Sequence, residues 1–351
     1  MIKKLRLRNF KGIKEGEIEL APLTIILGGN NSGKTTILEA LFLAPNPFRS
    51  VPYVIEGHNT AVEVVHSMHE TLSSEGHAFL LFNYAVNQAE ISCEEDGDEY
   101  FLQFIRHPKK SEYIWVSTNK EVVKPSSITI DGKDVNVYRI GQLHMAQKEY
   151  PGINPFREGL IDNTLLISSK LIKYAYKYLQ ENWAAIINLG ICKNVAGAVS
   201  GLIYDNYVDI TIEPFLGGKL AIYGFLEDGR RIRLGDLGEG VQSYIIARIL
   251  YELDKPKVLL WDDIEAHLNP RMLLNIAEWF FDIVENGNQV IFTTHSLEAA
   301  RTIASLNEEK AAIYLTSLEK NNLKAKSFTL KEMEKFLEAG IDIRVAEPFL
   351  L

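Results

Sequence analysis

Residues 23–36 read LTIILGGNNSGKTT, and this stretch decides the fold class of the chain. The apolar run at 23–27 predicts a buried strand, and residues 37–44 have helical character, so strand, glycine-rich loop and helix follow one another. The pattern G-x-x-x-x-G-K-[ST] is met by Gly28, Gly33, Lys34 and Thr35. A bland glycine turn would need neither flanking element. The sequence therefore predicts an α/β P-loop NTPase.

Each position of this loop has a separate predicted task. Glycines let backbone N–H groups approach the phosphates of a nucleoside triphosphate, and the following helix directs its positive end at the same anion. Lys34 would bridge the β and γ oxygens, and the Thr35 hydroxyl would ligate Mg²⁺. The predicted phosphate-binding residues are Gly28, Asn30, Asn31, Ser32, Gly33, Lys34, Thr35 and Thr36.

A second motif, KVLLWDDIEAHLNP at 257–270, is a short apolar run that ends in two carboxylates. Carboxylates at the carboxyl end of a buried parallel strand face the crevice beside a phosphate loop. We predict that Asp262 holds Mg²⁺ and that Asp263 orients or deprotonates the attacking water. Glu265, slightly further along, could support Asp263. Capping of a helix by Asp is the alternative, and it loses weight beside a P-loop.

Two further segments specify the subclass. Residues 289–296 read QVIFTTHS, an apolar strand ending in His295, and residues 237–243 read LGEGVQS, with two glycines before a helix-like stretch. This order of motifs resembles the ABC-type ATPase heads of the SMC, RecF and OLD families. The opening MIKKLRLRNFKGI and the pair Asn30-Asn31 are also similar to that branch. The resemblance covers residues 1–44 and 234–300.

The resemblance implies an ABC-type head that hydrolyses ATP with Mg²⁺. His295 would sense the γ-phosphate. Gly238 and Gly240 of one protomer would cap the nucleotide of the other, which implies an ATP-dependent homodimer. DNA maintenance or antiviral defence with a partner nuclease or effector protein is the implied role. Glu is usual in the family at the position of Asp263, so slow hydrolysis is one expectation.

Two alternatives belong to other functional classes. An ATP-gated DNA-binding clamp with negligible turnover is favoured by the shorter side chain of Asp263. The ATPase subunit of a membrane transporter is disfavoured by the RecF-like start. No apolar run approaches the roughly 18 residues of a membrane span, and the start has no secretion signal pattern, so a cytoplasmic protein without a membrane role is expected.

Composition limits the partners. The chain has 351 residues, a formal net charge of −9 and two cysteines, so neither a wholly basic nucleic-acid-binding surface nor a disulfide framework is expected. Two basic clusters are candidates for local contact with DNA, although basic residues on a solvated strand face are the commoner interpretation. These clusters are Lys4, Arg6 and Arg8, and Arg230, Arg231 and Arg233.

We predict three regions along the chain. Residues 1–155 form an N-terminal lobe whose alternating runs between 78 and 140 indicate an antiparallel β arm. Residues 156–205 form a helical insertion, judged by the spacing of Leu165, Ile172 and Leu179. Residues 206–351 form the C-terminal lobe.

Three weaker signals complete the sequence-based predictions. Gln142 and Gln147 are candidates for a magnesium-sensing glutamine. The histidines between 58 and 77 are a weak candidate for a zinc site, and exposed helix or loop histidines are the commoner interpretation. In the tail we expect strands near 311–316 and 323–328 and a helix around 330–337, and after His295 we expect neither room nor an acidic motif for a nuclease domain.

Overall fold

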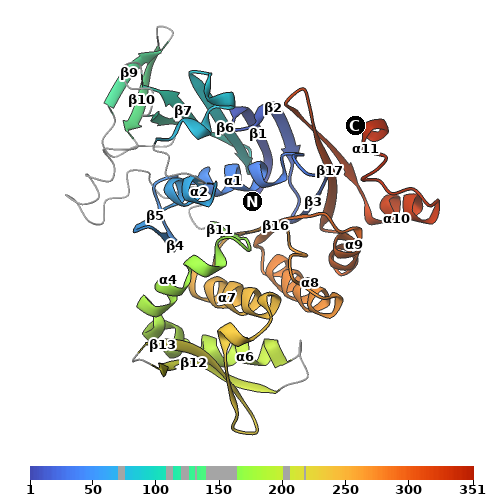
Figure 1. The fold of residues 1–351 in the computed structure, drawn as a ribbon. Helices are drawn as coiled ribbons and strands as arrows, with labels where there is room; N and C mark the ends of the chain where they lie inside the picture. The colour runs from blue at the N-terminus through green and yellow to red at the C-terminus, as the bar shows by residue number, and fades with distance from the viewer. Residues whose placement is uncertain are drawn as a thin grey trace.

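The computed structural model describes residues 1–69, 76–107, 114–119, 126–130, 133–139, 164–200, 206–216 and 219–351. One sheet of 13 strands runs through most of them, in the order β11-β15-β16-β3-β17-β18-β2-β1-β6-β7-β8-β10-β9. Helices pack around its parallel part, and a smaller lobe lies beside it (Figure 1). The fold is that of a mixed α/β P-loop ATPase head, as predicted.

The parallel part of the sheet carries the motifs. β3 (Leu23–Leu27) lies between β16 (Gln289–Thr294) and β17 (Ala311–Glu319), and β15 (Val258–Trp261) continues the order outward from β16. Every residue of β3, β15 and β16 is buried. Such unbroken apolar strands are typical of parallel strands covered on both faces. The covering helices are α1 (Lys34–Leu43), α7 (Glu239–Asp254), α8 (Pro270–Glu285) and α9 (Leu297–Ser305).

The predicted antiparallel strands are present from residue 88 onward, and they extend the main sheet. The prediction is wrong for residues 78–84, which form two short 3-10 helices in place of a strand. β6 (Gln88–Glu95) pairs antiparallel with β1 (Ile2–Phe10), whose other neighbour is β2 (Ile13–Glu19). This pairing covers an edge of β1 that would otherwise present unpaired backbone groups. The antiparallel part continues with β7 (Asp98–Arg106), β8 (Ile114–Thr118), β10 (Lys133–Arg139) and β9 (Ser126–Ile130), and β18 (Asn322–Phe328) pairs antiparallel with β17.

The predicted helical insertion is wrong at one place. Leu165 lies in β11 (Thr164–Ile167), a fully buried strand that pairs in parallel with β15. A four-residue apolar run fits a buried strand and a buried helix equally well, so the spacing alone did not separate them. Helical structure follows, in η3 (Ile172–Tyr174), α4 (Tyr176–Glu181), α5 (Trp183–Asn188) and α6 (Ile191–Ser200).

The smaller elements complete the fold. A separate three-stranded sheet consists of β12 (Tyr207–Pro214), β13 (Leu220–Leu226) and β14 (Arg231–Arg233). The chain between α1 and β6 contains β4 (Ser50–Ile55), β5 (His58–Thr60), α2 (Ala61–His69), η1 (Ala78–Leu80) and η2 (Phe82–Tyr84), of which α2 contacts α1. η5 (Leu234–Asp236) precedes α7, and the chain ends with α10 (Leu330–Glu338) and α11 (Glu347–Leu350).

Two observations on the described residues concern metal binding and membrane crossing. Within these residues, no set of three or more His, Cys, Asp or Glu side chains is arranged to hold a metal ion. His69 instead contacts the buried carboxylate of Glu39, and His58 lies 3.3 Å from Glu63. In the same part of the chain, no helix has both the length and the apolar character that a bilayer crossing requires.

Candidate functional site

The predicted phosphate loop and the predicted acidic motif meet at one edge of the sheet. β3, β15 and β16 are parallel, so their carboxyl ends share that edge. The Thr35 hydroxyl lies 3.2 and 3.0 Å from the two carboxylate oxygens of Asp262. Two residues 227 positions apart are thus in direct contact. Oxygen ligands of this kind suit Mg²⁺.

Lys34 lies at the centre of the site. Its side chain is buried, and Nζ donates to the carbonyl oxygens of Gly28 and Gly29 at 3.0 and 2.9 Å. Nζ also lies 3.1 Å from Nε2 of His295. An ammonium has only donors, so this contact requires Nε2 to accept. Burial lowers the pKa of the Lys34 ammonium, while nearby carboxylates, first that of Asp263, oppose the shift.

The P-loop backbone has the conformation that its glycines allow. Gly33 has φ 87° and precedes α1, whose first N–H groups donate to no capping side chain among the described residues. A Cβ at Gly28 would lie 2.4 Å from Oγ of Ser32 and 2.6 Å from the Thr316 carbonyl oxygen. The loop is therefore tightly seated and leaves the positive end of α1 available to an anion. Asn30 and Asn31 are exposed, whereas Thr36 is partly buried.

Asp262 is held by hydroxyl groups. In addition to Thr35, the Thr293 hydroxyl donates to Oδ1 of Asp262 at 2.7 Å. Burial raises the pKa of the Asp262 carboxyl above its usual value; the hydrogen bonds from Thr293 and Thr35 oppose this shift, and the Asp263 carboxylate adds to it. A carboxylate that is costly to keep charged without a counterion is well suited to a bound cation.

Asp263 faces the open side of the site. Its side chain is 48% exposed, and Oδ1 lies 3.6 Å from Nε2 of His295. Its backbone N–H donates to the Thr293 hydroxyl at 2.8 Å, and its φ of 49° lies in the left-handed region. Asp tolerates this conformation better than most residues. The structure therefore gives a local reason for Asp at this position.

Glu265 has a different environment from the one expected. Oε2 accepts a hydrogen bond from the Thr294 hydroxyl at 2.7 Å, and Oε1 accepts one from the backbone N–H of His295. Both oxygens therefore bind the segment that carries His295. By its geometry, Glu265 therefore supports the segment that carries His295 and not Asp263.

The two signature glycines differ in their surroundings. A Cβ at Gly240 would lie 2.2 Å from the carbonyl oxygen of His267, whereas a Cβ at Gly238 would have no described atom within 4 Å. Glu239 also pairs with His267, at 3.1 Å. Gly240 therefore lets α7 pack against the loop that follows Asp263. The N-terminal end of α7 at Gly238 faces open space.

Some predicted and unpredicted residues lie outside this set. Gln142 and Gln147 fall outside the described residues. Sequence reasoning missed Arg344, whose Nη1 donates to the carbonyl oxygen of His295. No local pattern marks Arg344, since it lies 49 residues from His295 and follows no motif.

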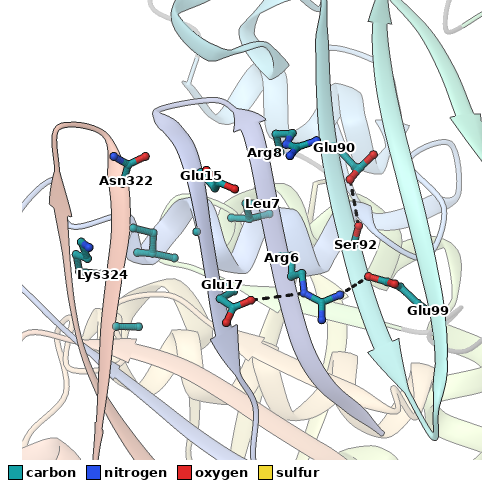
Figure 2. A pocket seen from close by; sticks show the side chains of 13 residues that line it. Arg6, Leu7, Arg8, Glu15, Glu17, Glu90, Ser92, Glu99, Asn322 and Lys324 are labelled. Atoms are coloured by element: carbon teal, nitrogen blue, oxygen red, sulfur yellow. Dashed lines mark hydrogen bonds and ion pairs between the residues drawn. The ribbon is translucent and has the colours of Figure 1, made fainter. Parts of the chain in front are cut away.

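Five of the six residues of the two basic clusters pair with carboxylates, and the sixth, Arg8, lies opposite Glu15 and Glu90 on the neighbouring strands. Lys4 lies 2.9 Å and Arg6 3.5 Å from Glu17, and Arg6 also contacts Glu99. Figure 2 shows this face, which lines a pocket of about 670 Å³ with acidic and basic side chains side by side. The second cluster pairs likewise, Arg230 with Asp228, Arg231 with Glu213 and Arg233 with Asp236, at 2.5 to 2.6 Å. Neither cluster is an uncompensated positive patch.

Comparison with known proteins agrees with these observations. Residues 1–154 match the family described as "AAA ATPase domain", and residues 145–300 match the one described as "AAA domain, putative AbiEii toxin, Type IV TA system". A Helicobacter pylori protein named ATP/GTP phosphatase is 23% identical over 91% of each chain. An OLD nuclease from Thermus scotoductus is 46% identical over 43 residues, which cover 12% of this chain and 8% of that protein.

Solved structures support the fold. An Smc head bound to the C-winged helix domain of ScpA matches with a TM-score of 0.55 and 16% identity, covering 95% of this chain and 99% of that one. An Smc head with an extended coiled coil, bound to a ScpA domain derived from Pyrococcus furiosus, matches with a TM-score of 0.53 and 14% identity, covering 96% and 98%. The motif order, the sheet and these matches together show a P-loop ATPase that is similar to proteins of the SMC/RecF/OLD-like branch.

Proposed function

We propose that this chain binds ATP with Mg²⁺ at the P-loop, hydrolyses it, and uses the nucleotide to join two heads. The observation that carries the proposal is the convergence of Lys34, Thr35, Asp262 and His295 at one edge of the sheet. An ammonium, a hydroxyl, a carboxylate and an imidazole then surround the place where the first turn of α1 would receive a phosphate. Backbone amides at that helix end add to the attraction.

The proposed roles follow from position and exposure. Lys34 would exchange its two loop carbonyls for the β and γ phosphate oxygens, which offer it a negative charge in place of neutral acceptors. Thr35 and Asp262 would hold Mg²⁺, which supplies charge neutralisation on the phosphates when bound. Asp263, exposed at the mouth, would orient the attacking water, and His295 would contact the γ-phosphate.

The test of the site uses two variants and a matched control. Lys34→Ala should abolish ATP binding, because it removes the buried cation. Asp263→Asn keeps the side-chain size and should retain ATP binding while phosphate release falls about 100-fold or more. Lys310→Ala removes a surface lysine paired with Glu285 at 2.6 Å and should change neither. Equal phosphate release by Asp263→Asn and the parent would remove Asp263 from the proposed chemistry.

Dimerisation is supported by the end of α7. Gly238 opens into space, and the described residues beside it form a pocket of about 580 Å³ that includes Lys170 and Lys173. A triphosphate presented by a second head would find there a helix N-terminus and two cations. Because Gly238 has φ −61° and ψ 146°, larger residues can occupy it without backbone strain.

Gly238→Leu therefore separates folding from dimerisation. The variant should fold and bind ATP as the parent does, but its mass with ATP should stay that of a monomer. Light scattering with and without ATP, on the Asp263→Asn background to slow turnover, provides the measurement. An ATP-dependent dimer of Gly238→Leu would show that this end of α7 does not meet the partner.

A role in DNA maintenance or antiviral defence with a partner protein is proposed from the resemblance alone. The alternative, an ATP-gated DNA clamp with negligible turnover, predicts ATP-dependent dimers and DNA retention without phosphate release. The carboxylates that accompany both basic clusters mean that the described surface gives this alternative no support. Retention of duplex DNA by the ATP-bound dimer at 150 mM salt, about physiological ionic strength, would favour it.

A further inference from the structure

The backbone of His295 is held from both sides. Its N–H donates to Oε1 of Glu265, and its carbonyl oxygen accepts from Nη1 of Arg344 at 2.5 Å. The other oxygen of Glu265 accepts from the Thr294 hydroxyl, which in turn accepts from the Ser296 N–H at 2.9 Å. The backbone groups on either side of the His295 ring are therefore fixed by side chains from two distant parts of the chain.

Arg344 is itself held in a fixed orientation. Nε and Nη2 form a fork on the Asp342 carboxylate, at 3.0 and 2.5 Å, so Nη1 remains directed at His295. The adjacent Ile343 is fully buried, and the N–H of Ile341 donates to the Phe336 carbonyl at 2.8 Å. A planar guanidinium can serve three acceptors in this geometry, and a lysine cannot.

Electrostatics agree with this geometry. The hydrogen bond to Asp342 raises the pKa of the Arg344 guanidinium, and the Glu265 carboxylate contributes in the same direction. Glu265 and Arg344 thus attract each other across the backbone of His295. If either side chain is removed, the other stays beside the backbone of His295 without its oppositely charged partner.

We propose that Arg344 is a positioning residue for His295, and that the C-terminal segment 339–351 supports ATP hydrolysis through this contact. The inference rests on the proposed contact of His295 with the γ-phosphate. The same segment also borders the phosphate loop, since a Cβ at Gly29 would lie 4.0 Å from Oε2 of Glu347. The end of the chain therefore lies against both the sensor of the γ-phosphate and the loop that binds it.

The experiment compares Arg344→Gln and Arg344→Lys with Arg301→Gln. Arg301 is a surface arginine on α9 that pairs with Glu334 at 3.0 Å, and it serves as the matched control. Both Arg344 variants should lower kcat about tenfold, because a misplaced catalytic contact is costly. The KM for ATP and the affinity for ADP should change less than about twofold, since binding depends mainly on the P-loop. The control should change neither.

A second readout is independent of turnover. In protein labelled with ¹⁵N-histidine, the ring signals of His295, assigned by their loss in His295→Ala, should shift in Arg344→Gln and keep their positions in Arg301→Gln. Unchanged His295 signals in Arg344→Gln would overturn the proposal. If the parent chain hydrolyses no ATP, the proposed function fails while this measurement still decides the positioning role.

A double-variant comparison separates positioning from general stability. On the His295→Ala background, Arg344→Gln should cause no further loss of kcat, because the group that it positions is gone. A further tenfold loss on that background would show that Arg344 acts by another route and would also overturn the proposal.

Discussion

Gly240 lies so close to His267 that an added Cβ would stand 2.2 Å from the His267 carbonyl oxygen. This contact joins the start of α7 to the loop that carries Asp263. Since the obstructing atom is backbone, it cannot move aside as a flexible side chain would. The glycine is thus required within the protomer, whatever it also contributes to a second head.

The first prediction concerns these two glycines. Gly240→Ala should lower the free energy of unfolding by about 1 to 3 kcal/mol, as overpacking does in a close-packed interior. Gly238→Ala should cost less than about 1 kcal/mol, because its Cβ meets no described atom and only a capping preference is lost. Urea unfolding of both variants provides the measurement. Equal losses would show that the close approach at Gly240 is relieved without cost.

The second prediction concerns the backbone of Asp263. Its φ of 49° is a conformation that Asn and Asp adopt readily and that costs other residues about 1 kcal/mol or more. Asp263→Glu should therefore lower the free energy of unfolding by about 1 kcal/mol, whereas Asp263→Asn should leave it nearly unchanged. Thermal unfolding without nucleotide tests both. A more stable Asp263→Glu variant would mean that the loop changes conformation.

The third prediction concerns a buried carboxylate next to the P-loop. Burial of Glu39 would raise its pKa, but hydrogen bonds from His69 and Lys11 outweigh burial, and the net pKa is lowered. A lowered carboxyl pKa contributes stability above the unfolded value, and this stability is lost as the pH falls through the folded value. Glu39→Gln should thus cost about 2 kcal/mol at pH 7.

The same substitution should cost progressively less as the pH falls below 4.5, the usual pKa of a glutamate side chain, because the parent carboxyl also becomes protonated. Urea titrations of both proteins between neutral and acidic pH provide the measurement. Glu63→Gln, which alters a more exposed carboxylate near His58, serves as the control. A cost for Glu39→Gln that is independent of pH would indicate a packing effect only.

The fourth prediction concerns Asp262, whose pKa shift has the opposite direction. Its folded pKa is raised, so the folded protein binds more protons than the unfolded chain between the two values, and stability falls as the pH rises through them. Asp262→Asn removes this penalty. The variant should gain stability relative to the parent from acidic to neutral pH in EDTA, and should lose the stabilisation that Mg²⁺ with ADP gives the parent. Retained Mg²⁺ stabilisation would exclude Asp262 as a ligand.

The sequence by itself determined the core of the site. A glycine loop between a buried strand and a helix, and a second apolar strand ending in acids, are local patterns whose chemistry depends on neighbours in the chain. Parallel strands bring their carboxyl ends to one edge, so the contact of Thr35 with Asp262 followed once both strands were recognised. The antiparallel strands were equally readable, because their alternation has a period of two.

Tertiary structure alone decided the rest. Whether residues 164–167 form strand or helix depends on their pairing with β15, because four apolar residues have no distinguishing period. Glu265 and Arg344 owe their place to the His295 backbone, which they reach from 30 and 49 residues away. Every non-proline residue has the same backbone N–H and carbonyl groups, so a hydrogen bond to the backbone cannot be predicted from the residue type at that position. Such contacts therefore become visible only when the chain is folded.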